Sequence, residues 1–216
     1  MKRYWLIAVV LLFTGDLFAQ IFVGVKGGYS VSTMEFTPVE DNKRLLDGGL
    51  DYGLTFKYYN AKHVGFQGDL YITHRGYRLP IDENDPKILF KRINTYIELP
   101  IFLQFRLNLK LVYLHVNAGP FISYLISAEE GNNTTGSYVM KDVNFNVLRD
   151  NRVDYGLMGG AGLSHDFSWG TIQAEIRIGY GFGNLYDHIY ADMPDESRSV
   201  VQSINVGYLY RFGKTE

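Results

Sequence analysis

Apolar and polar residues alternate strictly along much of the chain, and the clearest example is Thr171–Phe182. Successive side chains of an extended strand point to opposite faces, so a period of two predicts a β-strand. Twelve residues is about twice the usual strand length in soluble proteins, but it is enough to cross a bilayer at a tilt. One face carries Ile172, Ala174, Ile176, Ile178, Tyr180 and Phe182, and the other carries Thr171, Gln173, Glu175, Arg177, Gly179 and Gly181.

Eight segments share this alternation, and no segment carries the apolar stripe of an amphipathic helix. Without helices, nothing in the chain can cover eight apolar faces. Two sheets of a soluble sandwich could bury these faces against each other, or the faces could contact lipid. The predicted strands are Ile21–Tyr29, Leu50–Tyr58, Val64–Thr73, Asn94–Arg106, Leu111–Ile126, Val153–Ser164, Thr171–Phe182 and Val200–Phe212.

The connections between the predicted strands favour lipid. Short connections at Asn60–His63, Leu107–Lys110 and His165–Gly170 alternate with long ones at Ser30–Gly49, His74–Ile93, Ser127–Arg152 and Gly183–Ser199. This sorting is typical of outer-membrane barrels, whose turns are periplasmic and whose loops are extracellular, and a sandwich gives no reason for it. We therefore predict an all-β fold, an eight-stranded antiparallel up-and-down transmembrane β-barrel with short periplasmic turns and long extracellular loops.

The polar face of these strands carries charges of both signs in nearly equal number. In a sandwich they would be an ordinary solvated face. Inside an eight-stranded barrel the interior is just wide enough for side chains, and an unpaired buried charge costs several kcal/mol. We therefore predict a lumen plugged by paired charges, in which Glu175 and Arg177 pair with residues of neighbouring strands, Asp154 and Arg211. The predicted lumen ionic network is Lys26, Asp51, Lys57, Asp69, Glu98, Arg106, Asp154, Glu175, Arg177 and Arg211.

The N-terminus has the features of a secretory signal peptide. Lys2 and Arg3 precede the apolar run Tyr4–Phe13, and Ala19 offers a small residue before a cut at Gln20. A short membrane anchor is the alternative, but ten apolar residues are too few for a spanning helix. We predict a signal peptide over residues 1–19 and an outer-membrane β-barrel domain over residues 20–216.

Five motifs follow one another along the chain, and they are Gly24–Gly28, Tyr96–Phe105, Ala118–Phe121, Asp154–Leu157 and Tyr180–Leu185. Together they resemble the PorT-like family of outer-membrane β-barrel proteins of Bacteroidota, which carry the outer membrane protein beta-barrel domain. The resemblance implies an outer-membrane barrel, often labelled porin-like. PorT itself is implicated in type IX secretion, and no motif ties this chain to that role. Tyr208–Phe212 resembles the aromatic-ending last strand that the barrel assembly machinery recognises, although Gly213–Glu216 follow.

Candidate chemistry changes this picture little. The net charge of −2 gives no basic field for nucleic acid, and the lack of cysteine removes disulfides, thiolate metal sites and a lipoprotein anchor. Some barrels of this size modify lipids with a histidine at the outer rim, where His74 and His188 would lie as solvated loop residues, but no nucleophile–base spacing accompanies them. Such an enzyme would alter lipid A in a way that His74→Ala abolishes.

We therefore predict no enzyme, cofactor or metal, and a structural role or one mediated by the outer loops. A narrow porin-like solute channel is the second possibility, because the predicted lumen is polar. The predicted partners are outer-membrane lipid and lipopolysaccharide, the barrel assembly machinery, and an extracellular or envelope protein of unknown identity. The predicted location is the outer membrane, of Bacteroidota type.

Overall fold

A computed structural model of the chain describes residues 20–37, 45–81, 85, 87–134, 137–143, 151–183 and 196–212. The predicted signal peptide lies outside the described residues. The strands are β1 (Gln20–Thr37), β2 (Leu45–Tyr59), β3 (Val64–Pro80), β4 (Leu89–Asn108), β5 (Tyr113–Asn132), β6 (Val139–Asp142), β7 (Val153–Phe167), β8 (Gly170–Gly181) and β9 (Glu196–Phe212).

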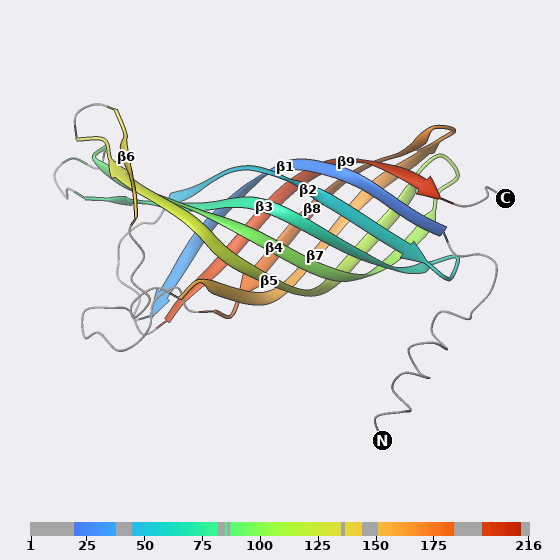
Figure 1. Ribbon diagram of the computed structural model, residues 1–216. Coiled ribbons are helices and arrows are strands. Elements are labelled where there is room, and N and C mark those ends of the chain that lie inside the picture. Colours follow the sequence, from blue (N-terminus) through green and yellow to red (C-terminus); the bar gives the residue numbers. More distant parts are fainter. Residues whose placement is uncertain are drawn as a thin grey trace, which may run out of the picture.

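Eight of these strands form a closed antiparallel ring (Figure 1). Each strand of the ring pairs with its neighbours in the sequence, β1 pairs with β9, and the pairing of β4 with β5 completes the closure. The short strand β6 pairs only with the end of β5, where Asn132 lies opposite Val139. The predicted eight-stranded up-and-down barrel is confirmed, and β6 is an addition to it.

The strands extend further on the extracellular side than the alternation predicted. β1 continues to Thr37, β3 to Pro80 and β5 to Asn132, so most of the predicted loops Ser30–Gly49 and His74–Ile93 is paired strand. The predicted loop Ser127–Arg152 likewise contains the end of β5 and all of β6. These extensions were missed because their side chains do not keep an apolar outer face, which only the lipid-facing part of a strand requires.

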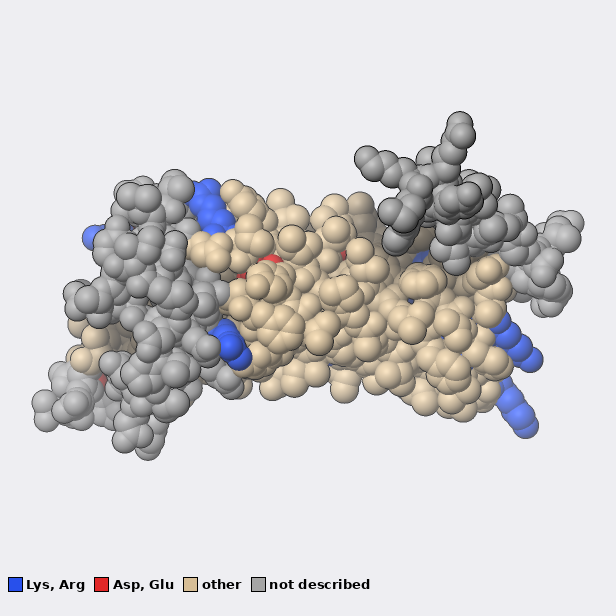
Figure 2. All heavy atoms as spheres, turned by 90° about the horizontal axis from the view of Figure 1, so that it is seen from below, with Lys and Arg blue, Asp and Glu red and all other residues tan. Residues whose placement is uncertain are grey.

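The barrel is apolar outside and polar inside, the reverse of a soluble protein. Val25, Leu54, Leu157, Ile176 and Ile204 expose between 56% and 62% of their surface, whereas the side chains between them are buried. Figure 2 shows the middle of one face as largely free of charged residues, with Lys and Arg side chains protruding near the ends. A ring of paired strands leaves no open edge, so the strands pair their backbone groups with one another, as a bilayer demands.

Aromatic rings gather at both ends of this apolar surface. Trp169 stacks between Phe167 and Tyr208 at the turn end, with ring centroids 4.8 and 5.5 Å apart. At the loop end, Phe182 contacts Tyr155 and Tyr180 at 6.4 and 5.8 Å. Such girdles mark the two membrane interfaces. Among the described residues, none belongs to a helix that is long and apolar enough to cross a membrane.

Candidate functional site

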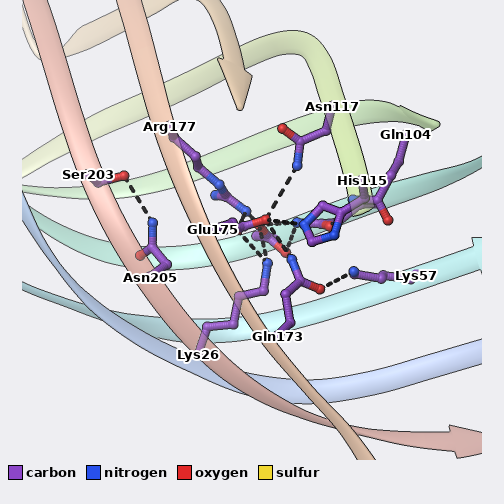
Figure 3. A network of polar contacts seen from close by, with 12 residues as sticks. Lys26, Lys57, Gln104, His115, Asn117, Gln173, Glu175, Arg177, Ser203 and Asn205 are labelled. Atoms are coloured by element: carbon purple, nitrogen blue, oxygen red, sulfur yellow. Dashed lines mark hydrogen bonds and ion pairs between the residues drawn. The ribbon is translucent and has the colours of Figure 1, made fainter. Parts of the chain in front are cut away.

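Two clusters of buried charged side chains lie inside the barrel, a lower one nearer the turn end and an upper one nearer the loop end. The lower cluster is the larger. We define the lower ionic cluster as Lys26 (β1), Lys57 (β2), Asp69 (β3), Glu175 and Arg177 (both β8). Lys26 Nζ lies 2.7 Å from Glu175 Oε1 and 3.6 Å from Asp69 Oδ2. Arg177 bonds both carboxylates, so the four charges form one continuous network (Figure 3). Their side chains are at most 4% exposed.

The partners of Glu175 and Arg177 come from across the lumen, so the predicted pairing with adjacent strands is wrong. Lys26 and Asp69 lie on β1 and β3, and neither of these strands pairs with β8. In so narrow a barrel, a long side chain reaches the opposite wall as easily as its neighbour. The predicted partners are engaged elsewhere, Asp154 with Arg75 at 2.9 Å and Arg211 with Asp166 at 3.3 Å.

Amide side chains surround the lower ionic cluster and direct their donors toward its carboxylates. Gln67 Nε2 donates to both oxygens of Asp69, at 3.0 and 3.3 Å. Gln173 Nε2 donates to Glu175 Oε2 at 2.6 Å, and Asn117 Nδ2 donates to the same oxygen at 3.4 Å. His115 Nε2 lies 3.5 Å from that oxygen. Each carboxylate of the cluster therefore accepts from several donors.

The upper ionic cluster consists of Arg75 (β3), Glu98 (β4) and Asp154 (β7). Arg75 bonds both acids, while Ser199 Oγ and the backbone N of Gly183 also donate to Asp154, at 2.8 and 3.2 Å. The Arg75 guanidinium lies 5.0 and 5.3 Å from the ring centroids of Tyr96 and Phe121. A guanidinium against aromatic faces keeps favourable contacts where water is scarce.

Apolar layers separate and close these ionic clusters. We call Phe102, Phe121 and Met158 the middle apolar layer, because these buried side chains pack together. On β4, Phe102 is two residues from Gln104 on one side, and Glu98 of the upper ionic cluster is four residues away on the other. Below the lower ionic cluster, the buried residues Phe22, Tyr59 and Leu209 form an apolar floor. The lumen is therefore layered rather than uniformly ionic.

Glycine makes room for the lower ionic cluster. A Cβ atom at Gly162 would lie 2.7 Å from both Glu175 Cβ and His115 Nε2, and one at Gly207 would meet Lys26 Cγ. Real Cβ atoms do not come this close to other heavy atoms. The long charged side chains therefore need these two positions to lack a side chain.

The structure divides most of the ten predicted lumen charges between the two ionic clusters and the turn end of the barrel. Five form the lower ionic cluster, and Glu98 and Asp154 belong to the upper one. Asp51 is buried nearby and accepts bonds from Ser30 Oγ and the His74 backbone N, at 3.1 and 3.2 Å. Arg106 and Arg211 lie at the turn end instead. There Arg106 donates to Gln20 Oε1 at 2.9 Å, and its guanidinium lies 3.9 Å from the Tyr59 ring.

The sequence prediction left out several residues that complete the lumen. The buried amides Gln67, Gln104 and Gln173 lay on the predicted polar faces, so alternation could have included them, whereas Arg75 lay just past the predicted strand Val64–Thr73. His74 lies within β3, not in a solvated loop, and its Nδ1 is 2.5 Å from the Leu50 carbonyl oxygen. His188 lies outside the described residues.

A closed ring of strands with an apolar exterior and a charged interior is a transmembrane β-barrel, and one of eight strands is among the smallest of this class. The chain belongs to the family described as outer membrane protein beta-barrel domain, whose model matches residues 18–187. It is therefore a small outer-membrane β-barrel protein.

Solved structures of bacterial outer-membrane proteins share this fold. OprG from Pseudomonas aeruginosa is 12% identical, with 91% of this chain and 96% of that chain covered and a TM-score of 0.51. Ail, the attachment invasion locus protein of Yersinia pestis, is 19% identical (89% and 99% covered, TM-score 0.43), and E. coli outer membrane protein W is 14% identical (90% and 98%, 0.46). At these identities the likeness concerns the fold alone. No curated protein sequence matches the chain significantly.

Proposed function

We propose that the protein is a closed barrel that acts through its extracellular end, and neither a solute channel nor an enzyme. The observation that carries this proposal is the layering of the lumen. Phe102, Phe121 and Met158 interrupt the polar interior between the two ionic clusters, and the apolar floor lies beneath the lower one. A solute or hydrated ion would have to pass both apolar layers and displace saturated ion pairs, which costs several kcal/mol per charge.

Conductance recordings test this closed state. We expect the wild-type protein in planar bilayers to show no steady open-state current. Insertion is verified in the same preparation by heat-modifiable migration on a gel. The double variant Phe102→Ala/Phe121→Ala removes most of the middle apolar layer and leaves the charges in place. It should therefore show transient currents that the wild type does not show. A steady wild-type current would establish the narrow porin-like channel instead.

The extracellular end offers the surface for an interaction. Beyond the lipid-facing belt, β6 and the neighbouring strand ends expose apolar side chains, including Leu46, Tyr138 and Val139 at 47%, 37% and 54%. Basic residues accompany them, with Lys91 Nζ 2.9 Å from Asp47. A photo-crosslinking residue at position 139 should capture an envelope or extracellular protein in the native membrane, whereas the same residue at position 176 should capture lipid. Capture of lipid alone at both positions would contradict this role.

The histidine chemistry that an enzyme of this kind would need has no support in the described lumen. His74 Nδ1 lies against the Leu50 carbonyl oxygen, and His115 lies beside Glu175 in the buried lower ionic cluster. Ser30 Oγ contacts His74 only at its backbone carbonyl oxygen, at 2.9 Å, and neither imidazole ring has a hydrogen bond to a serine hydroxyl among the contacts of the described residues. We accordingly propose a binding or structural role with lipid, lipopolysaccharide or protein as partner.

We further propose that the chain is exported by a signal peptide cleaved before Gln20. β1 begins at Gln20, and the side chain of Gln20 accepts a hydrogen bond from Arg106. Gln20 is therefore part of the folded barrel, which supports a cut just before it. N-terminal sequencing of the membrane-embedded protein tests the cleavage. The PorT-like motifs support a Bacteroidota-type protein, and the aromatic end of β9 at Phe212 supports recognition by the barrel assembly machinery. A role in type IX secretion is not part of this proposal.

A further inference from the structure

Lys57 is a buried cation that lacks a carboxylate partner. The residue is 3% exposed and lies next to the apolar floor, opposite Phe22 in the β1–β2 register. Its ammonium group donates to Gln173 Oε1, and no carboxylate oxygen of the described chain lies within 4.0 Å of it. An ammonium has three donors and no acceptor, so two donors have no partner among the described side chains.

Both nearby carboxylates are bonded by groups other than Lys57. Glu175 Oε1 accepts from Lys26 and Arg177, and Oε2 accepts from Gln173 and Asn117. Asp69 is bonded by Gln67 and Arg177, and Lys26 lies within ion-pair distance of it. The orientation of the Gln173 amide is fixed as well, since its nitrogen is committed to Glu175. Lys57 therefore remains outside the network of compensated charges.

The lower ionic cluster has a net positive charge, so a group that balances it must be negative. Lys26, Lys57 and Arg177 are three cations against the two carboxylates of Asp69 and Glu175, which leaves one positive charge in excess. The other titratable side chains at the cluster include His115, which adds either no charge or a further positive one, and Tyr71, whose phenol is uncharged at neutral pH, so neither of them reverses the sign. An isolated charge buried in this way costs several kcal/mol.

Unpartnered acceptors do not supply the missing negative group. Four buried oxygens of neutral side chains have no hydrogen-bond partner in the described chain, and they are Asn117 Oδ1, Asn205 Oδ1, Thr55 Oγ1 and the Tyr71 hydroxyl oxygen. Figure 3 shows that the Asn117 and Asn205 amides turn their oxygens away from Lys57. None of these neutral groups carries the negative charge that would balance Lys57.

We propose that the lower ionic cluster binds one small monovalent anion, of the chloride class, beside the Lys57 ammonium. The anion makes the cluster neutral and accepts the two remaining Lys57 donors. The apolar floor and the middle apolar layer enclose this place, so the anion is taken up as the barrel folds and acts as a structural counter-ion. A small spherical anion suits a packed lumen.

Refolding with different anions tests this site. The urea-unfolded protein is refolded into detergent at equal ionic strength in bromide, chloride or gluconate, and unfolding is followed by heat-modifiable migration on a gel. At an anion concentration one hundred times its Kd, the folded-to-unfolded ratio should rise about 100-fold in bromide or chloride over gluconate. Lys57→Met should abolish this difference, and Lys62→Met, at an exposed lysine in the β2–β3 turn, should preserve it.

Crystals grown from bromide give a second measurement, which does not depend on the folding of any variant. We expect an anomalous peak beside Lys57 Nζ in the wild-type protein. Equal wild-type stability in bromide and gluconate, together with no peak at Lys57, would overturn the proposal and show that Lys57 is an uncharged amine. A peak elsewhere in the lumen would also overturn it. The two proposals fail separately. A steady conductance would refute the closed-barrel function, whereas the bromide measurements decide the anion site.

Discussion

Glu175→Gln is expected to be among the most destabilising single substitutions in the lumen. Glu175 accepts bonds from Lys26, Arg177, Gln173 and Asn117 in the driest part of the barrel. The amide keeps the shape but loses the charge, so three cations would remain with one carboxylate. Breaking a buried ion network by removing one partner costs about 3–5 kcal/mol. The free energy of unfolding, measured by urea titration in liposomes, should fall by about this amount.

Two further variants separate charge balance from general damage. Glu129→Gln makes the same chemical change at an exposed position of β5 and should leave the free energy of unfolding almost unchanged. Lys26→Met combined with Glu175→Gln removes one charge of each sign, so the double variant should lose less stability than the sum of the two single variants. Additive losses would mean that the two residues contribute packing and not a coupled ion pair.

Ile176→Arg is expected to have the second large effect, because it places a charge on the lipid face. Ile176 is 62% exposed in the middle of β8, between Ala161 and Ile204 of the neighbouring strands. In water this substitution would be harmless, but an arginine on the lipid face at the bilayer midplane costs about 2–4 kcal/mol. Folding yield and urea stability in liposomes should both decrease.

Val139→Arg is the matched control, because Val139 is similarly exposed, at 54%, but lies on β6 outside the lipid-facing ring. Its free energy of unfolding should match that of the wild type. Equal, small effects of the two arginines would mean that both residues face water, and the assignment of the outer surface to lipid would then fail. Equal, large effects would place β6 in the bilayer as well.

The alternation of residues was a reliable guide where the chain passes through the membrane, and it failed beyond it. In Thr171–Phe182 every second side chain had to be apolar because lipid covers that face, so the strand and its faces were predictable. The extensions of β3 and β5 to Pro80 and Asn132 carry mixed residues, because the medium around them does not select for apolar side chains. β6 has only four residues and was invisible for the same reason.

The sequence could not predict which charged residues form ion pairs. Alternation placed Glu175, Arg177 and Asp69 on the lumen side, and the near-neutral charge of that side indicated pairing. It could not give the partners, because the lumen brings together Lys26 and Glu175, which are 149 residues apart in the sequence. Nor could it separate the upper ionic cluster from the lower one, since Phe102 and Phe121 are apolar residues on the face that was expected to be polar.

The sequence by itself therefore determined the number of strands in the ring, their order, and which face of each meets lipid. These properties follow from backbone geometry, in which neighbouring side chains alternate, and from the length of chain between strands. The tertiary structure decided which charges meet, where apolar layers close the lumen, and that Lys57 has no carboxylate partner. Those properties depend on how the ring closes, because the stagger of the strands sets which residues face each other across the interior.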